Sequence, residues 1–200
     1  MMSNLQADRK KIGRIVASPV VKVLEKTPVT PNMLTWFGSM IAVAAGVVIG
    51  LGHPFIAGFI VLFGGLFDML DGALARRTDR ITKFGGILDS TLDRVSESVI
   101  LIGLLVMFAI DQSTVGVIIA GITWLGSFMV SYIRSRAEAA GMDCQVGVFT
   151  RPERVIIISL GLLLSQFEYV LIGALALVAV LSLVTASQRL LYVWQQTKIN

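Results

Sequence analysis

The stretch FDMLDGALARRTDRITKFGGILDSTLDR, residues 67–94, decides how this chain can fold. Four of its aspartates, at positions 68, 71, 89 and 93, lie in segments that are otherwise long and apolar. Carboxylates close to a membrane core are costly in free energy and usually serve a function. We therefore interpret the rest of the sequence as a scaffold that brings these four groups together.

The composition favours a helical membrane protein over a soluble one. Of the 200 residues, 55% are hydrophobic and only 15% are charged, and the mean hydropathy is +0.80. A soluble domain has about 25% charged residues. Because a membrane-crossing helix needs about 20 mostly apolar residues, six spans in one domain over residues 1–200 fit this length. The net charge of +4 points to membrane topology and anionic lipid rather than to nucleic acid, so no nucleic-acid partner is expected.

The expected fold class is all-α, a polytopic membrane protein with six transmembrane helices that follow a cytoplasmic, interfacial amphipathic helix. Residues 8–26 alternate apolar and basic side chains, which favours a helix in the membrane interface over a solvated basic arm. Thr30 with Pro31, and the pattern Thr150 to Glu153, are start signals for two of the later helices. The predicted spans cover residues 32–51, 54–76, 84–110, 114–140, 151–164 and 169–195.

The distribution of basic residues predicts the orientation of the chain. All 17 Lys and Arg residues lie on one side of the predicted bundle, whereas the turns at 52–54, 111–113 and 165–168 hold none. Cytoplasmic segments carry the excess of Lys and Arg in membrane proteins. We therefore expect a multi-pass protein of the cell membrane whose two termini and aspartate stretch face the cytoplasm.

The spacing of the four aspartates places them on helix faces. Asp68 and Asp71 are three residues apart and Asp89 and Asp93 are four apart, so each pair shares one face. Four converging carboxylates repel one another unless cations neutralise them. Oxygen-only ligands favour Mg²⁺, Mn²⁺ or Ca²⁺ over zinc, and Mg²⁺ usually also binds substrate phosphates. The alternative is a helix bundle in which these aspartates pair with nearby arginines.

The same residues form a sequence signature. The pattern Asp68-x2-Asp71-Gly72-x2-Ala75-Arg76-x8-Gly85-x3-Asp89-x3-Asp93 resembles that of the CDP-alcohol phosphotransferases at every defined position. The resemblance extends over the whole length, including Asn32 and Thr35 at the start of the first span. It implies transfer of the phosphatidyl group of CDP-diacylglycerol, or of its ether-lipid equivalent CDP-archaeol, to an alcohol in phospholipid biosynthesis, with release of CMP.

The resemblance also implies roles for individual residues. Two Mg²⁺ ions, for which Mn²⁺ can substitute, would be bound by Asp68, Asp71, Asp89 and Asp93. Asp93 would in addition be the catalytic general base that takes the proton of the acceptor hydroxyl. The CDP-lipid would contact Asn32, Thr35, Asp68, Asp71, Gly72, Ala75, Arg76 and Gly85. A homodimer in the lipid bilayer is implied by the resemblance alone.

A second region of the sequence bears on the acceptor. Arginines occur in SYIRSRAEAAG (131–141), in RPER (151–154) and at position 189. A phosphate-bearing acceptor would need such a cluster, but cytoplasmic anchoring explains the same arginines, so charge alone does not decide. Both stretches resemble the branch of the family that makes phosphatidylinositol phosphate or its archaeal ether-lipid equivalent. That resemblance implies an inositol 1-phosphate site, with glycerol 3-phosphate as the alternative acceptor, formed by Ser131, Arg134, Arg136, Arg154 and Arg189.

Two other functional classes fit the composition less well. A membrane prenyltransferase also pairs Mg²⁺ with a lipid pyrophosphate, but it is expected to carry two separated aspartate motifs rather than one compact signature. An ion transporter is expected to have acidic residues distributed through the membrane depth, whereas here they cluster near one side. Glu97 extends the stripe of Asp89 and Asp93 by one turn, and we expect it to make a structural hydrogen bond rather than to act near the metal.

Overall fold

The computed structural model describes residues 19–167 and 169–199, and these residues form helices and short connections without any strand. Residues 19–24 are helical, whereas residues 8–18 of the predicted interfacial helix lie outside the described part of the chain. The long helices follow in the order α2 (Pro31–Gly50), α3 (Pro54–Arg77), α4 (Lys83–Ile110), α5 (Thr114–Ala139), α6 (Arg151–Leu163) and α7 (Val170–Ile199).

The helix ends agree closely with local sequence signals. Thr30 Oγ1 accepts a hydrogen bond from the Met33 amide, which caps α2 ahead of Pro31 in its first turn. The capping box that starts α6 is also present, because the Glu153 carboxylate accepts from the Thr150 amide at 2.7 Å. Helix limits differ from the predicted limits by one residue or less, except that α7 ends at Ile199 instead of residue 195.

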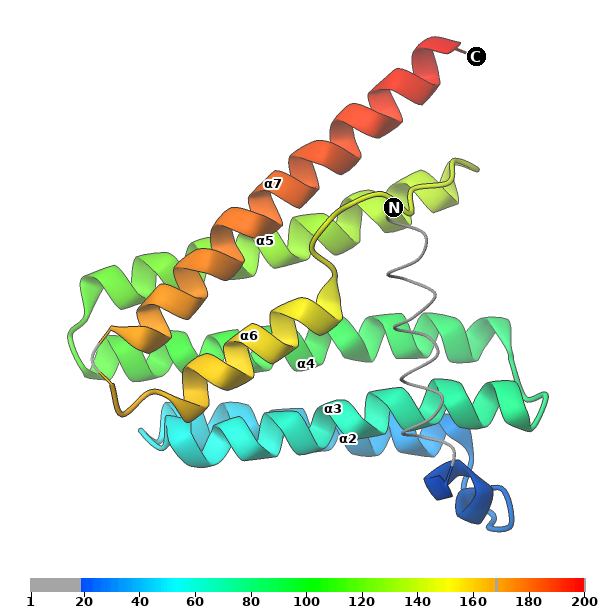
Figure 1. The fold of residues 1–200 in the computed structure, drawn as a ribbon, viewed down its shortest axis with the longest axis horizontal. Helices are drawn as coiled ribbons and strands as arrows, with labels where there is room; N and C mark the ends of the chain where they lie inside the picture. The colour runs from blue at the N-terminus through cyan, green and yellow to red at the C-terminus, as the bar shows by residue number, and fades with distance from the viewer. Residues whose placement is uncertain (1–18, 168, 200) are drawn as a thin grey trace.

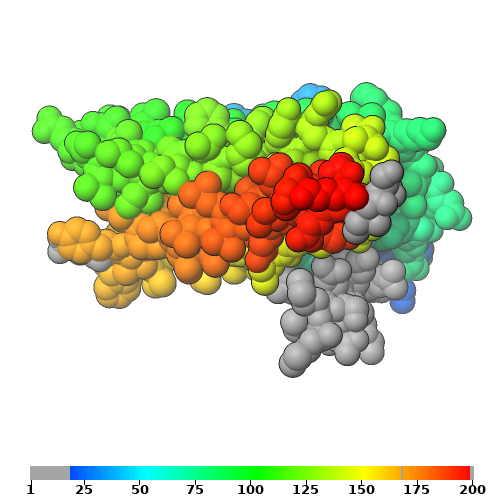
Figure 2. All heavy atoms as spheres, turned by 90° about the horizontal axis from the view of Figure 1, so that it is seen from above, coloured from blue at the N-terminus to red at the C-terminus, as the bar shows by residue number. Residues whose placement is uncertain are grey.

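Each of the six long helices packs against two others: α2 against α3 and α4, α5 against α4 and α7, and α6 against α3 and α7. Figure 1 shows that the short turns α2–α3, α4–α5 and α6–α7 lie together at one end. The longer connections α3–α4 and α5–α6 lie at the other end, on the same side as the end of α7. Figure 2 shows α7 running beside α5 along one face, in agreement with their packing contacts.

Close contact between α2 and α4 defines the centre of the bundle. A Cβ atom on Gly103 of α4 would collide with the backbone carbonyl of Gly46 of α2, so the two backbones touch at this point. Neighbouring core residues such as Ala45, Ile49 and Leu104 are fully buried. Small residues allow this approach, which holds the start of α4 in a fixed position beside α2.

Four helices, rather than six, are long and apolar enough to cross a membrane within the described residues: α2, α3, α5 and α7. The prediction of six spans is therefore supported only in part. α6 has 13 residues, which at 1.5 Å per residue gives about 20 Å, less than the roughly 30 Å of a hydrocarbon core. α4 is long enough, but its first half carries the charged residues Lys83, Asp89, Asp93 and Arg94.

Candidate functional site

The aspartates of the signature lie on α3 and α4, which both pack along α2 rather than along each other. Asp68 and Asp71 are one turn apart on α3, and Asp89 and Asp93 are one turn apart on α4. Because α2 separates the two helices by its own width, a space remains between them at this end of the bundle. The four aspartates line three neighbouring cavities: Asp68 one, Asp71 and Asp89 a second, and Asp89 and Asp93 a third.

Asp71 is the most deeply buried of the four. Its residue is 5% exposed, and the Thr35 hydroxyl of α2 donates a hydrogen bond to its Oδ2 at 2.7 Å. A buried carboxylate needs such partners, because leaving it unpaired would cost free energy. Thr35, which the resemblance assigned to the donor, thus also fixes the orientation of a signature aspartate.

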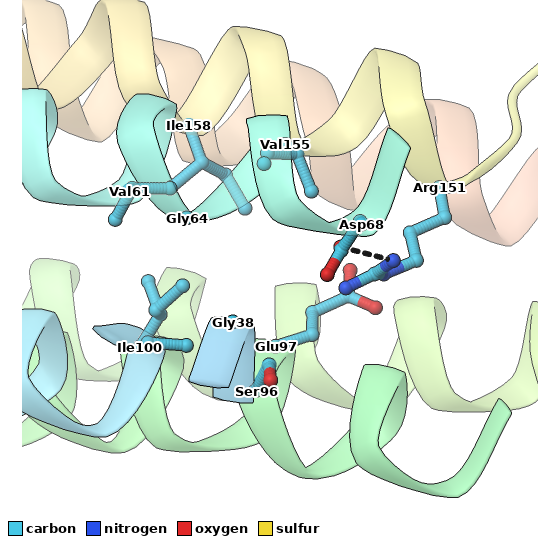
Figure 3. A pocket seen from close by; sticks show the side chains of 12 residues that line it. Gly38, Val61, Gly64, Asp68, Ser96, Glu97, Ile100, Arg151, Val155 and Ile158 are labelled. Atoms are coloured by element: carbon cyan, nitrogen blue, oxygen red, sulfur yellow. Dashed lines mark ion pairs between the residues drawn. The ribbon is translucent and has the colours of Figure 1, made fainter. Parts of the chain in front are cut away.

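Arg151 lies between the two acidic helices. Its Nη1 is 2.7 Å from Asp68 Oδ2 on α3 and 2.6 Å from Asp93 Oδ1 on α4. Figure 3 shows its side chain reaching from the start of α6 to Asp68, with Glu97 of α4 next to them. The sequence reasoning missed this contact and counted Arg151 only as part of a basic segment. One feature of the sequence pointed to a carboxylate partner for Arg151: the residue lies in the first turn of a helix, where a positive charge is unfavourable.

The donor atoms at this site fit a hard divalent cation. Among the described residues, no three His, Cys, Asp or Glu side chains lie close enough together, as they stand, to hold a metal ion. The carboxylates of Asp68 and Asp93 instead share one positive group, the Arg151 guanidinium. Carboxylate oxygens are the ligands that Mg²⁺ and Mn²⁺ prefer, so the residue types at this site fit such an ion.

A cavity of about 280 Å³ opens between α2, α3 and the start of α4, and we call it the donor cavity. It contains all but one of the residues that the resemblance assigned to the CDP-lipid: Asn32, Thr35, Asp71, Gly72, Ala75, Arg76 and Gly85. Asp68 is the exception, because its carboxylate is turned toward Arg151 and lines a separate cavity of about 30 Å³ under α6.

Two glycines keep the donor cavity open. A Cβ atom on Gly72 would lie 3.2 Å from the Arg76 guanidinium, and one on Gly85 would lie 2.9 Å from Thr82 Oγ1. Larger side chains at these positions would therefore fill space within the cavity. Arg76 itself is exposed and lies over Gly72, where its planar guanidinium is available for a phosphate.

A second cavity, of about 390 Å³, lies between α4, α5, α6 and α7, and we call it the basic cavity. It contains four of the five residues predicted for the acceptor: Ser131, Arg134, Arg154 and Arg189. Arg136 does not line it, in contrast to the prediction. Since successive helical residues are rotated by about 100°, positions 134 and 136 point to nearly opposite sides of α5, and Arg136 is exposed.

Two of the predicted arginines are held by protein groups. Arg154 is 1% exposed, and its Nε and Nη2 donate to the two Glu97 oxygens at 2.6 and 2.9 Å. Arg189 donates to the backbone carbonyls of Val130 and Val146 at 2.6 and 2.8 Å. The expectation that Glu97 makes a structural contact is confirmed, although its arginine partner was not foreseen. These contacts orient the arginines while leaving other N–H groups of each guanidinium for a ligand.

The two large cavities meet at the aspartates. Gly86 and Asp89 line both of them, and Asp93 lines the basic cavity beside Arg151. A molecule in each cavity would therefore place its reacting group near the same carboxylates. This arrangement is suited to transfer of a group between two bound substrates.

The chain matches the CDP-alcohol phosphatidyltransferase family over residues 28–187. It is 42% identical, over 84% of its length and 85% of the relative's, to archaetidylinositol phosphate synthase of Pyrococcus horikoshii. The crystal structure of Mycobacterium tuberculosis phosphatidylinositol phosphate synthase with CDP-DAG bound superimposes with a TM-score of 0.82 at 36% identity, covering 90% of this chain and 94% of that one. The same enzyme in complex with manganese and citrate gives a TM-score of 0.81 at 37% identity, covering 89% and 88% of the two chains.

Proposed function

Because the chain belongs to the CDP-alcohol phosphatidyltransferase family, we propose that it transfers the phosphatidyl group, or its ether-lipid equivalent, from a CDP-linked lipid to inositol 1-phosphate. CMP is the second product. The chain is thus a transferase of phosphate-containing groups in phospholipid biosynthesis. The observation that carries this assignment is the meeting of the donor cavity and the basic cavity at Asp89.

The donor cavity is suited to the cytidine diphosphate end of the lipid donor. Gly72 and Gly85 leave room in it, and the exposed Arg76 offers a positive charge to the pyrophosphate. Asn32 and Ala75 complete its walls. The exposed apolar faces of α2 and α3 adjoin this cavity, and they are suited to the acyl or isoprenoid chains of a donor that stays in the bilayer.

Asp68, Asp71, Asp89 and Asp93 are the residues proposed to hold two Mg²⁺ ions, for which Mn²⁺ can substitute. Such ions, when bound, neutralise the pyrophosphate and the charge that develops on the leaving group. The manganese complex of the mycobacterial relative supports a divalent ion here. Thr35 keeps the Asp71 carboxylate oriented, and the α2 backbone keeps α3 and α4 at a fixed separation.

Asp93 is the proposed general base, because it lines the basic cavity and not the donor cavity, whereas Asp89 lines both. It accepts the proton of the acceptor hydroxyl while that oxygen forms a bond to the phosphorus next to the lipid. The bond from this phosphorus to the oxygen of CMP breaks in the same displacement. Arg134, Arg154 and Arg189 hold the phosphate of the acceptor and aim its hydroxyl at Asp93.

The membrane arrangement is proposed as well. We propose one domain over residues 1–200 with six membrane segments, in which the shorter α6 and the polar half of α4 reach the cytoplasmic surface beside the site. The absence of Lys and Arg from the turns at one end supports a cytoplasmic location for the site and both termini. A homodimer is proposed from the family resemblance.

A panel of substrates tests the proposed activity. Purified protein is given labelled CDP-diacylglycerol or CDP-archaeol with inositol 1-phosphate, glycerol 3-phosphate, free inositol or serine, and lipid products and CMP are measured. Inositol 1-phosphate is expected to give the highest kcat/KM, and omission of Mg²⁺ is expected to stop turnover. A higher kcat/KM for glycerol 3-phosphate would reassign the acceptor, and a preference for serine or free inositol would contradict a phosphate site in the basic cavity.

Arg134 and Arg136 provide a matched pair for testing where the acceptor binds. Arg134→Gln removes a cation that lines the basic cavity, and it is expected to raise the KM for inositol 1-phosphate by about tenfold. The KM for the CDP-lipid should stay within about twofold. Arg136→Gln removes the same charge from the opposite side of α5 and should change neither KM. Equal effects of the two substitutions would indicate a general charge effect instead of a contact.

A further inference from the structure

We propose that Arg151 is a positioning residue that couples cation binding to acceptor binding. Without a divalent cation it neutralises Asp68 and Asp93, and on cation binding its guanidinium is released to the basic cavity, where it adds positive charge for the acceptor phosphate. The inference rests on the proposed function for the identity of the acceptor. The part of the proposal that concerns cation binding depends only on the ion pairs of Arg151 with Asp68 and Asp93.

The contacts of Arg151 differ from those of a purely structural arginine. Arg154 binds Glu97 through two nitrogens and is almost completely buried. The Arg151 Nη1 atom instead lies between two carboxylates, those of Asp68 and Asp93, and its buried Nε has no hydrogen-bond partner. An unpaired buried N–H group costs about 1–3 kcal/mol, so this arrangement is not a fully satisfied bridge. Of Arg151 and Arg154, Arg151 is therefore the one that can separate from its carboxylate partners more easily.

The backbone at Arg151 is fixed, whereas its side chain is partly exposed. The capping box between Thr150 and Glu153 defines the first turn of α6, and α6 packs against α3 and α7. A positive charge in the first turn of a helix is disfavoured by the helix dipole, so Arg151 does not stabilise α6 itself. Its side chain is 24% exposed, which leaves it access to solvent in the adjoining cavity.

Arg151 borders both places that the proposal requires. It lines the small cavity with Asp68 and also the basic cavity with Arg154 and Arg189. A cation bound by Asp68 and Asp93 competes directly with the guanidinium for the same oxygens. Once released, Arg151 joins the other arginines that line the basic cavity, and their mutual repulsion is relieved by an anion such as the acceptor phosphate. Because coupling free energies are reciprocal, the acceptor should in turn strengthen cation binding.

The first experiment, the cation arm, measures the affinity of the purified full-length protein for Mn²⁺ in detergent, with no donor or acceptor present. The electron paramagnetic resonance signal of free Mn²⁺ reports how much of the ion is not bound. Arg151→Gln removes the competing guanidinium and is expected to tighten Mn²⁺ binding by about tenfold. Arg94→Gln is the matched control, because Arg94 lines the same cavity but binds Ser90, Ser131 and Ser135 instead of a carboxylate. It is expected to change the affinity by less than about threefold.

The acceptor arm repeats the titration with saturating inositol 1-phosphate. We expect the ligand to tighten Mn²⁺ binding by about fivefold or more in the unmodified protein, and to have no such effect in Arg151→Gln. An equal effect of inositol 1-phosphate in both proteins would overturn the coupling. Two results would overturn the proposal that the cation displaces Arg151 from its carboxylates. One is unchanged or weaker Mn²⁺ binding in Arg151→Gln, and the other is the same tightening in Arg94→Gln.

Melting temperatures of all variants are measured first. If Arg151→Gln fails to fold, Arg151→Met keeps most of the volume of the side chain and carries the same expectations. The cation arm contains no lipid and no alcohol, so it stands or fails independently of the substrate panel. A preference for a different acceptor in that panel would change the proposed function without altering the expected Mn²⁺ affinities.

Discussion

Replacing Asp93 by Asn is expected to lower the rate of CMP release by at least about a thousandfold, because general-base catalysis alone contributes 10²–10⁴. The amide cannot accept the proton of the acceptor hydroxyl, and it also removes a negative charge from the proposed cation site. Asp93 lies in the basic cavity, where the acceptor is proposed to bind. The measurement is steady-state release of CMP from CDP-diacylglycerol with inositol 1-phosphate.

Asp79→Asn is the matched control for this substitution. Asp79 lies in the α3–α4 connection of the same stretch, is exposed and lines none of the three cavities described above. Its φ of 51° is left-handed, a conformation that Asn adopts readily, so the control should fold normally and remain active. Mn²⁺ affinity measured on both variants separates loss of the cation from loss of the base. Turnover of Asp93→Asn close to that of the unmodified protein would refute the base assignment.

Replacing Arg154 by Ala is expected to cost about 3–5 kcal/mol of stability, because it leaves the buried Glu97 carboxylate without its partner. The pair links the middle of α4 to the start of α6, so its loss should loosen the contact that brings Arg151 to the aspartates. The measurement is the thermal or denaturant midpoint of the purified protein in detergent. A stability within about 1 kcal/mol of the unmodified protein would contradict this expectation.

Two further variants separate charge from packing. Arg134→Ala breaks an ion pair with Glu138 that is about half exposed, and it should cost less than about 1 kcal/mol. The double variant Glu97→Leu with Arg154→Met removes both charges and fills their volume, so it should recover most of the lost stability. Failure of the double variant to recover would show that packing of the arginine stem, not its charge, holds α4 to α6. Acceptor binding by Arg154→Ala is interpretable only where the variant is folded, which makes Arg134 the cleaner test of the acceptor site.

The sequence predicted the helices and the faces of the signature well, since both depend on local rules. Thr30 and the Thr150–Glu153 capping box start helices where their hydrogen bonds require, and the three- and four-residue spacings place each aspartate pair on one side of its helix. The resemblance identified seven of the eight predicted donor residues that now line one cavity. The six predicted membrane spans are supported only in part, because four helices among the described residues have the length and hydropathy of a span.

The contacts between distant segments were not predictable from the same rules. Helical periodicity indicates that position 136 lies opposite position 134, but only the packing of α5 decides which of the two faces the basic cavity. The partners of Arg151 and Arg154 likewise depend on how α6 crosses α3 and α4. A single sequence carries no direct signal for such pairs, because any arginine at a cytoplasmic helix end also satisfies the rule for membrane orientation.

The sequence by itself therefore determined the helices, the acidic faces of residues 68–93 and, through the family resemblance, the class of reaction. The tertiary structure decided which charges meet: Arg154 with Glu97, and Arg151 with both Asp68 and Asp93. The physical reason is that backbone hydrogen bonding and side-chain periodicity act within one helix. Ion pairs between helices are set by packing distances and crossing angles, which the close approach of α2 to α4 and the position of α6 establish.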